Sequence, residues 1–249
     1  MQLSLSDAML YHLPPMPLPD RSGRVAYVYL DESNFKISGE TAYKESHQID
    51  PKERIDWHYD VRALKDIIRR GTGMEVDEEV NLNVYGSNLE RSLVSQDLNL
   101  HSSFVFSSRR KRKQPEKQVD TMLVRDMALD TVHLQEFKDS GVFVLVSGDN
   151  DMIPSVAYAL QCEYTVHVFA WKGSVSDEYT QLAHDGDIKL TLLDKFLDTL
   201  TMANSSVPMA KLRFSHNCVV RLKHGVNKLG DKLAGYFHRS RKLKLELDY

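Results

Sequence analysis

The chain has 249 residues, of which 42% are hydrophobic, and a formal net charge of −3. This length suits one large domain or two small ones, and the hydrophobic fraction predicts a folded core rather than a disordered chain. No apolar run approaches the ~20 residues that span a bilayer, and no basic start followed by an apolar stretch marks a secretory signal. Cys162 and Cys218 are too few for a disulfide framework. We therefore expect a cytoplasmic protein with reduced thiols and no membrane partner.

The charge is unevenly distributed along the chain. From residue 205 onward there are ten basic and three acidic residues, a net charge of +7, which leaves −10 for the rest. Within that acidic part lies a basic block, Arg109-Arg110-Lys111-Arg112-Lys113. Acidic clusters and basic blocks in one chain suit an enzyme that binds metal ions and holds a polyanion.

The first 23 residues are predicted to form a Pro-rich arm. Four prolines at positions 14, 15, 17 and 19 exclude a regular helix or a central strand there. After residue 200 the chain changes character again, and we expect a basic, helical C-terminal extension over 201–249. This extension suits either an RNA-binding arm or a helix that forms a homo-oligomer.

Between these ends, patterns typical of strands and helices alternate. Strands are indicated by apolar runs that end at turn residues, and helices by apolar residues three or four positions apart. In chain order we expect a strand at 24–30, a polar loop or insertion at 38–54, a helix at 57–68 that stops at Gly71, a strand at 80–85, a short helix at 87–97, a strand at 103–106, a helix at 117–129, a strand at 142–146, a helix at 153–161, a strand at 165–170, a helix at 174–185, a strand at 188–192 and a helix at 194–200. This order predicts a three-layer α/β/α domain over 24–200 with a mainly parallel central sheet.

The stretch from Gly141 to Pro154 is the centre of this pattern. Its apolar run Val142–Val146 is typical of a strand buried on both faces. The run ends in Ser147-Gly148-Asp149-Asn150-Asp151, and Pro154 suits the first turn of a helix. Carboxylates at the carboxyl end of a buried strand lie where open α/β sheets bind ligands. An ordinary acidic turn is the alternative interpretation.

Two further segments place carboxylates in comparable positions. Asp31 follows the first strand, and Asp120 lies in the first turn of a helix, where an acid also complements the helix dipole. Carboxylate oxygens are the ligands that Mg²⁺ and Mn²⁺ prefer, and such ions lower the pKa of water and neutralise phosphate charge. Together with Asp149 and Asp151, these acids indicate a metal site.

The acids belong to three spaced motifs, Asp31-x-x-Asn34, Lys117-x-Val119-Asp120 and Ser147-Gly-Asp149-x-Asp151-x-x-Pro154. As a set they resemble the signature of NYN domains, within the PIN-like nuclease superfamily, and the spacing is closest to the LabA-like branch. The resemblance covers about residues 24–200, including the downstream region of Ser176 and the acid Asp185. It implies a PIN-like fold and metal-dependent hydrolysis of RNA that leaves 5′-phosphate and 3′-hydroxyl ends.

The resemblance also implies roles for individual residues. The Mg²⁺ or Mn²⁺ ligands and catalytic residues would be Asp31, Asp120, Asp149 and Asp151. Asn34 and Ser147 would position water, metal or phosphate and Lys117 would contact the phosphate, and we expect these residues, with Asn150, to bind the substrate. Separately from the resemblance, the basic block suggests that Arg109, Arg110 and Lys111 hold the RNA backbone beside the acids.

Two positions depart from the family pattern, and a third adds a further acid. Glu32 stands where a small Gly is common in the family, and Met152 stands where Phe is common. Neither removes a ligand, although Glu32 could crowd or extend the acidic cluster. Asp126 is a further acid, six residues after Asp120 and so turned about 120° round the helix. We place it outside the ligands themselves.

Alternative interpretations differ from a ribonuclease in class. A binding module of the same fold would hold RNA without cutting it. A phosphatase of haloacid-dehalogenase type is rejected, because its second acid would stand two positions after Asp31, where the chain has Ser33. The basic block 109–113 also suits a solvated loop or a nuclear-localisation signal.

Overall fold

The computed structural model describes residues 23–108 and 117–202. These residues form a six-stranded sheet in the order β3-β2-β1-β4-β5-β6, in which every neighbouring pair is parallel. The strands are β1 (Val25–Asp31), β2 (Glu79–Ser87), β3 (Phe104–Ser108), β4 (Gly141–Val146), β5 (Thr165–Ala170) and β6 (Lys189–Leu192). The predicted α/β class with a mainly parallel sheet is confirmed.

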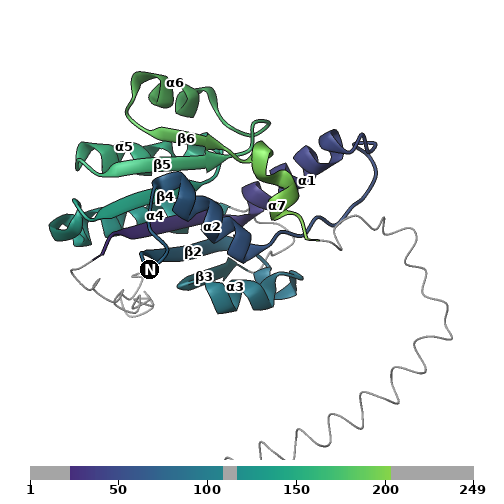
Figure 1. Ribbon diagram of the computed structural model, residues 1–249, viewed down its shortest axis with the longest axis horizontal. Helices are drawn as coiled ribbons and strands as arrows, with labels where there is room; N and C mark the ends of the chain where they lie inside the picture. Colours follow the sequence, from purple (N-terminus) through teal and green to yellow (C-terminus); the bar gives the residue numbers. More distant parts are fainter. Residues whose placement is uncertain (1–22, 109–116, 203–249) are drawn as a thin grey trace, which may run out of the picture. The chain divides into compact units, whose positions relative to one another are not determined.

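Helices cover both faces of this sheet (Figure 1). One face carries α1 (Glu32–Ser46), α2 (Val61–Thr72), α3 (Ser95–His101) and α7 (Leu197–Leu200). The other carries α4 (Lys117–His133), α5 (Ile153–Gln161) and α6 (Asp177–Asp185). Short 3₁₀ helices complete the described elements: η2 (Leu89–Arg91), η3 (Gln135–Phe137), η4 (Asn150–Met152) and η5 (Leu193–Phe196).

Alternation along β1 decides which face each of its side chains joins. Val28 and Leu30 pack with the α1 and α2 core, whereas Tyr27 and Tyr29 pack with the α4 and α5 core. Because side chains alternate with a period of two, Asp31 at the end of the strand lies on the α4 side.

The strand order creates a switch point between β1 and β4. From β1 the chain moves outward through β2 and β3, returns by α4 to β4 on the other side of β1, and then moves outward through β5 and β6. Ligands of open α/β sheets bind beyond the carboxyl ends of the strands at such a point. The register pairs Leu30 with Val146, so Asp31 and Ser147 leave neighbouring strands at the same level.

The predicted polar loop over 38–54 is wrong over its first half, because Glu32–Ser46 forms α1. Phe35, Gly39 and Tyr43 are buried at four-residue spacing along one face of this helix. A Cβ atom at Gly39 would lie 2.3 Å from a ring carbon of Trp57. A glycine therefore occupies a buried helical position, and this hides the apolar period in the sequence.

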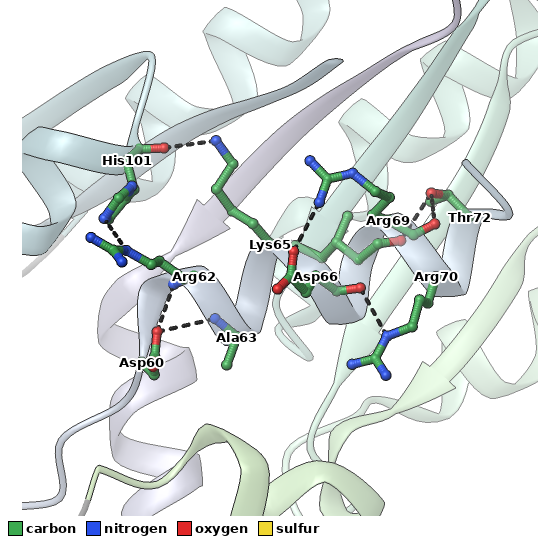
Figure 2. Close-up of polar contacts among 10 residues, drawn as sticks. Asp60, Arg62, Ala63, Lys65, Asp66, Arg69, Arg70, Thr72 and His101 are labelled. Carbon is green, nitrogen blue, oxygen red and sulfur yellow. Dashed lines mark hydrogen bonds and ion pairs between the residues drawn. The ribbon is translucent and has the colours of Figure 1, made fainter. Parts of the chain in front are cut away.

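The second helix begins later than predicted and ends later. It begins after Asp60, whose Oδ1 accepts from the backbone N–H of Arg62 at 2.8 Å and that of Ala63 at 3.0 Å, and Figure 2 shows this cap. It ends at Gly73, which has a φ of 69°, rather than at the predicted Gly71. The left-handed conformation at Gly73 provides the stop that the sequence suggested two residues earlier.

The outer face of α2 carries a row of basic side chains (Figure 2). Arg62 donates from Nε to Nε2 of His101 at 2.8 Å, and Lys65 donates from Nζ to the carbonyl oxygen of His101 at 2.9 Å. Further along, Arg69 pairs with Asp66 at 2.8 Å. The two contacts with His101 join α2 to the end of α3, on the face of the sheet opposite α4.

The predicted short helix at 87–97 is wrong over most of its length, because β2 runs to Ser87, η2 follows, and α3 begins only at Ser95. The remaining predicted elements agree with the structure to within a few residues. The described domain reaches Thr201, whose Oγ1 accepts from Trp57 Nε1 at 2.9 Å. The predicted arm, the basic block and the C-terminal extension lie, apart from Gly23, Thr201 and Met202, outside the described residues. In the part of the chain that is described, no helix is long and apolar enough to cross a membrane.

Candidate active site

Asp31 is the most deeply placed acid at the switch point. It ends β1 and caps α1, with Oδ1 accepting from the backbone N–H of Asn34 at 3.1 Å. Its other oxygen, Oδ2, accepts from the hydroxyl of Ser147 at 3.2 Å. The residue is 3% exposed. The strand, the helix cap and the serine together fix this carboxylate in one position.

The turn after β4 is joined to the start of α1 by a chain of hydrogen bonds. Ser147 Oγ accepts from the backbone N–H of Asp149 at 3.2 Å, and Asn34 Oδ1 accepts from that of Gly148 at 3.2 Å. Asp149 Oδ1 in turn accepts from the backbone N–H of Asp151 at 3.0 Å. Two of the three sequence motifs therefore meet in one hydrogen-bonded unit.

Asp120 brings the third motif to the same place. The pKa of Asp31 is raised to about 7, mainly by burial and also by the negative charges of Asp120 and Asp149, while hydrogen bonds from Asn34 and Ser147 act in the opposite direction. Among the side chains that the structure describes, no cation is one of the groups that shift this pKa. The first turn of α4 thus faces the end of β1, and the negative charges of Asp120 and Asp149 both act on the carboxylate of Asp31.

The donor set fits a hard divalent cation. Among residues 23–108 and 117–202, no three Asp, Glu, His or Cys side chains are already gathered as a finished metal site. Mg²⁺, however, keeps several waters and is commonly held by one or two carboxylates together with substrate phosphates. A buried Asp31 repelled by two neighbouring acids is the environment in which such an ion would relieve the repulsion.

The remaining predicted site residues either lie on the exposed surface beside the acids or have side chains outside the described structure. Asn150 and Asp151 are exposed on η4, and Asp151 does not contribute to the field at Asp31. Lys117 begins α4, but its side chain is outside the described structure, as are Arg109, Arg110 and Lys111.

Glu32 does not extend the acidic cluster. It is buried on the opposite side of β1 from Asp31, and its Oε1 accepts from the hydroxyl of Tyr59 at 3.5 Å. Burial raises its pKa, and the positive charge of Lys36 lowers it. The unusual residue of the first motif is therefore accommodated by the α1 and α2 core rather than by the site.

Asp126 and Asp130 belong to a second buried network beneath α4. Asp126 accepts from the hydroxyl of Tyr85 at 3.0 Å and from Nε of Arg125 at 2.8 Å. Asp130 accepts from the hydroxyl of Tyr29 at 2.6 Å, and burial raises its pKa to about 6. Both acids have tyrosine donors from the sheet, so they fasten α4 in place instead of facing the switch point.

The resemblance includes Ser176 and Asp185, at the two ends of α6, but the sequence did not identify how this helix contributes to the site. Ser176 donates its backbone N–H to the carbonyl oxygen of Gly148 at 3.0 Å, and Tyr179 donates its hydroxyl to the carbonyl oxygen of Asp149 at 3.0 Å. An aromatic residue at helical spacing indicates a core position, and nothing in the pattern of 174–185 marks Tyr179 as a neighbour of the acids.

Comparison with known protein families agrees with the motifs. A family model described as NYN domain matches residues 25–187, which is more than half of the chain. No curated protein and no solved structure matches the chain significantly.

Asp31→Asn is expected to stabilise the metal-free domain above neutral pH. The folded-state pKa of Asp31 lies near 7, above the ordinary value of 3.8, so the neutral form favours folding. The contribution of the neutral carboxyl to the stability of the fold is fully present below pH 4, and it is lost as the pH rises through the folded-state pKa near 7. At pH 8 the free energy of unfolding of the variant should exceed that of the wild type by roughly 2–4 kcal/mol.

Urea unfolding in chelator across pH 4–8 measures this difference. Subtracting the variant from the wild type removes the titration of Asp130 and other shared groups. A difference that stays constant across this window would contradict the assigned burial and repulsion.

Proposed function

The chain belongs to the NYN domain family of PIN-like nucleases, and from this premise we propose that it is a metal-dependent ribonuclease that hydrolyses RNA. The observation that carries the proposal is the buried Asp31 at the β1/β4 switch point, in the field of Asp120 and Asp149. The spacing of the three motifs further supports a place in the LabA-like branch.

We assign the metal to Asp31, Asp120 and Asp149, with Asp151 at the rim. Proteins of this family typically use divalent metal ions, and carboxylate oxygens suit Mg²⁺ or Mn²⁺. When bound, such an ion lowers the pKa of water and neutralises the charge on a phosphate. The protein contributes a rigid arrangement of acids at the edge of a buried sheet.

Asn34 and Ser147 act mainly by positioning the acids. The Ser147 hydroxyl donates to Asp31 and accepts from the backbone of Asp149, so its hydrogen-bonding capacity is largely used within the site. The side-chain oxygen of Asn34 accepts from the backbone N–H of Gly148, which leaves the side-chain NH₂ group of Asn34 as a donor. We therefore assign phosphate contact to Asn34 and Lys117 rather than to Ser147.

The RNA backbone is expected to approach from the side of the basic block. Residues 109–113 lie in sequence between Ser108, at the carboxyl end of β3, and Lys117, at the start of α4. Ser108 and Lys117 both lie on the side of the sheet where the strands end, which is also where the acids lie. We propose that Arg109, Arg110 and Lys111 contact phosphates there, with Asn150 at the opposite rim.

A non-catalytic RNA-binding module is the second candidate. It is favoured by the lack, among the described residues, of three acids already gathered around one point. Incubation of the purified protein with labelled single-stranded RNA, in Mn²⁺ or in chelator, separates the two. Cleavage only in Mn²⁺ supports the enzyme, whereas binding without cleavage supports the module.

Asp149→Asn should abolish most of the cleavage while leaving RNA binding intact. The substitution keeps the size of the side chain but removes a charge and a strong ligand oxygen, and such losses reduce the rate on the order of 10²-fold or more. Single-turnover cleavage and a binding titration in Ca²⁺ measure the two effects. The matched control is Asp187→Asn, an exposed acid just before β6, at the amino edge of the sheet. Wild-type rates in Asp149→Asn would place the chemistry elsewhere.

Asp126→Asn should lower the stability of the fold clearly and reduce the cleavage rate only slightly. The buried carboxylate accepts from Tyr85 and from charged Arg125, so weakening these bonds costs about 1–3 kcal/mol. Thermal melts and single-turnover rates on the same preparation separate the effects. We expect the rate to fall by less than about tenfold, in contrast to the losses from removing a metal ligand. A loss as large as that of Asp149→Asn would move Asp126 into the catalytic group.

Replacing Arg109, Arg110, Lys111, Arg112 and Lys113 by Ala should weaken RNA binding and reduce its salt dependence. Each lost phosphate contact lowers the slope by roughly 0.7 on single-stranded RNA. The control replaces Arg62 and Arg70, exposed on α2 across the sheet, by Gln. An unchanged slope in the block variant, or an equal change in the control, would assign the block to another role.

A further inference from the structure

The turn that carries Asp149 bonds through its N–H groups to Asn34 and Ser147, and a second distant segment, residues 174–179 at the end of the β5–α6 connection and the start of α6, holds its carbonyl groups. The backbone N–H of Ser176 donates to the carbonyl oxygen of Gly148 at 3.0 Å. The hydroxyl of Tyr179 donates to the carbonyl oxygen of Asp149, also at 3.0 Å. Consecutive carbonyl groups of the turn are therefore tied to the start of α6.

The backbone of the same segment packs directly against the backbone of the turn at Gly148. A Cβ atom on Gly148 would meet the carbonyl oxygen of Ser174 at 2.3 Å and its carbonyl carbon at 2.6 Å. A contact this short with backbone atoms cannot be relieved by rotating a side chain. Only glycine fits at this position, and the turn has no room to move toward residues 174–176.

Tyr179 supplies the one side-chain contact among these. It is fully buried, with 0% exposure, in the core between the sheet and helices α4 to α6. Burial raises its pKa above the ordinary value, and the charges of Asp149 and Asp31 raise it further. Its hydroxyl therefore stays protonated and stays a donor, and it lies within the field of both acids.

The contact is made with the main chain of Asp149 and not with its carboxylate. The Asp149 carboxylate accepts at Oδ1 from the backbone N–H of Asp151 and has remaining lone pairs. Tyr179 can thus fix where the side chain of Asp149 begins without occupying the oxygens that a metal needs.

We propose that Tyr179 is a positioning residue for the metal: by holding the Asp149 main chain, it sets the carboxylate of Asp149 relative to Asp31 and Asp120. This inference rests on the proposed metal-dependent function and adds to it a residue that none of the three motifs contains. Groups that orient metal ligands typically change metal affinity 10–100-fold when they are removed.

Tyr179→Phe tests the proposal, because it removes the hydroxyl and keeps the ring. In the full chain we expect the Mn²⁺ dissociation constant, measured by calorimetry without RNA, to rise about tenfold or more. The single-turnover cleavage rate should approach that of the wild type once Mn²⁺ is raised enough to saturate the variant.

Two other tyrosines on the same face of the sheet provide matched controls. Tyr29→Phe removes a buried hydrogen bond to Asp130, and Tyr164→Phe removes a buried hydroxyl that has no partner among the described residues. Tyr29→Phe should lower the melting temperature in chelator at least as much as Tyr179→Phe and leave Mn²⁺ affinity near that of the wild type. Tyr164→Phe should change neither quantity.

Two results would overturn the positioning role. Wild-type Mn²⁺ affinity in Tyr179→Phe would show that the contact does not set the ligand. An equal loss of affinity in Tyr29→Phe would show that the effect is one of general stability. If the wild-type protein itself bound no Mn²⁺, the proposed metal site would fail first, and this inference would fail with it.

Discussion

The site depends on the parallel pairing of β1 with β4. Their register places Leu30 opposite Val146, so Asp31 and Ser147 emerge side by side where both strands end. β1 and β4 are buried along their whole length, because helices cover both faces of the sheet. Backbone ladders and two apolar cores therefore fix the position of Asp31 before any contact within the site is made. The bond from the Ser147 hydroxyl to Asp31 only completes an arrangement that the strands already impose.

The acids of α4 illustrate two different uses of a buried carboxylate. Asp126 and Asp130 face tyrosine hydroxyls from β2 and β1, so their burial is compensated by donors of the sheet. Asp31 has hydrogen bonds from Asn34 and Ser147, but it also faces Asp120 and Asp149. The bonds from the tyrosines fasten α4 to the sheet, whereas the ionised carboxylate of Asp31 also meets two like charges and costs stability in the metal-free domain. Such a cost, maintained at the edge of a rigid sheet, is typical of sites in which function rather than folding selects the residues.

Much of this arrangement could be predicted from the sequence, for identifiable reasons. Buried parallel strands read as continuous apolar runs, and the acids that follow β1 and β4 are visible directly after those runs. The helix α1 could not be read in the same way, because Gly39 occupies a buried position against Trp57 and interrupts the apolar period. The sequence also could not tell that Glu32 and Asp31, although adjacent, lie on opposite sides of β1, since that depends on where the strand ends.

The three carboxylates are anchored in unequal ways, and this explains why α6 takes part in the site. Asp31 ends a central strand and caps a helix, and Asp120 lies on a long helix that is fastened to the sheet. Asp149 lies beyond the last paired residue of β4, in a turn without ladder hydrogen bonds. Ligands of a metal site have to be held to within about 0.5 Å, so a carboxylate in such a turn needs restraints other than a strand ladder. The contacts from Ser176 and Tyr179 restrain the carbonyl groups of this turn, whose N–H groups already donate to Asn34 and Ser147. The site therefore depends on the β5–α6 connection as well as on the motifs that carry its acids.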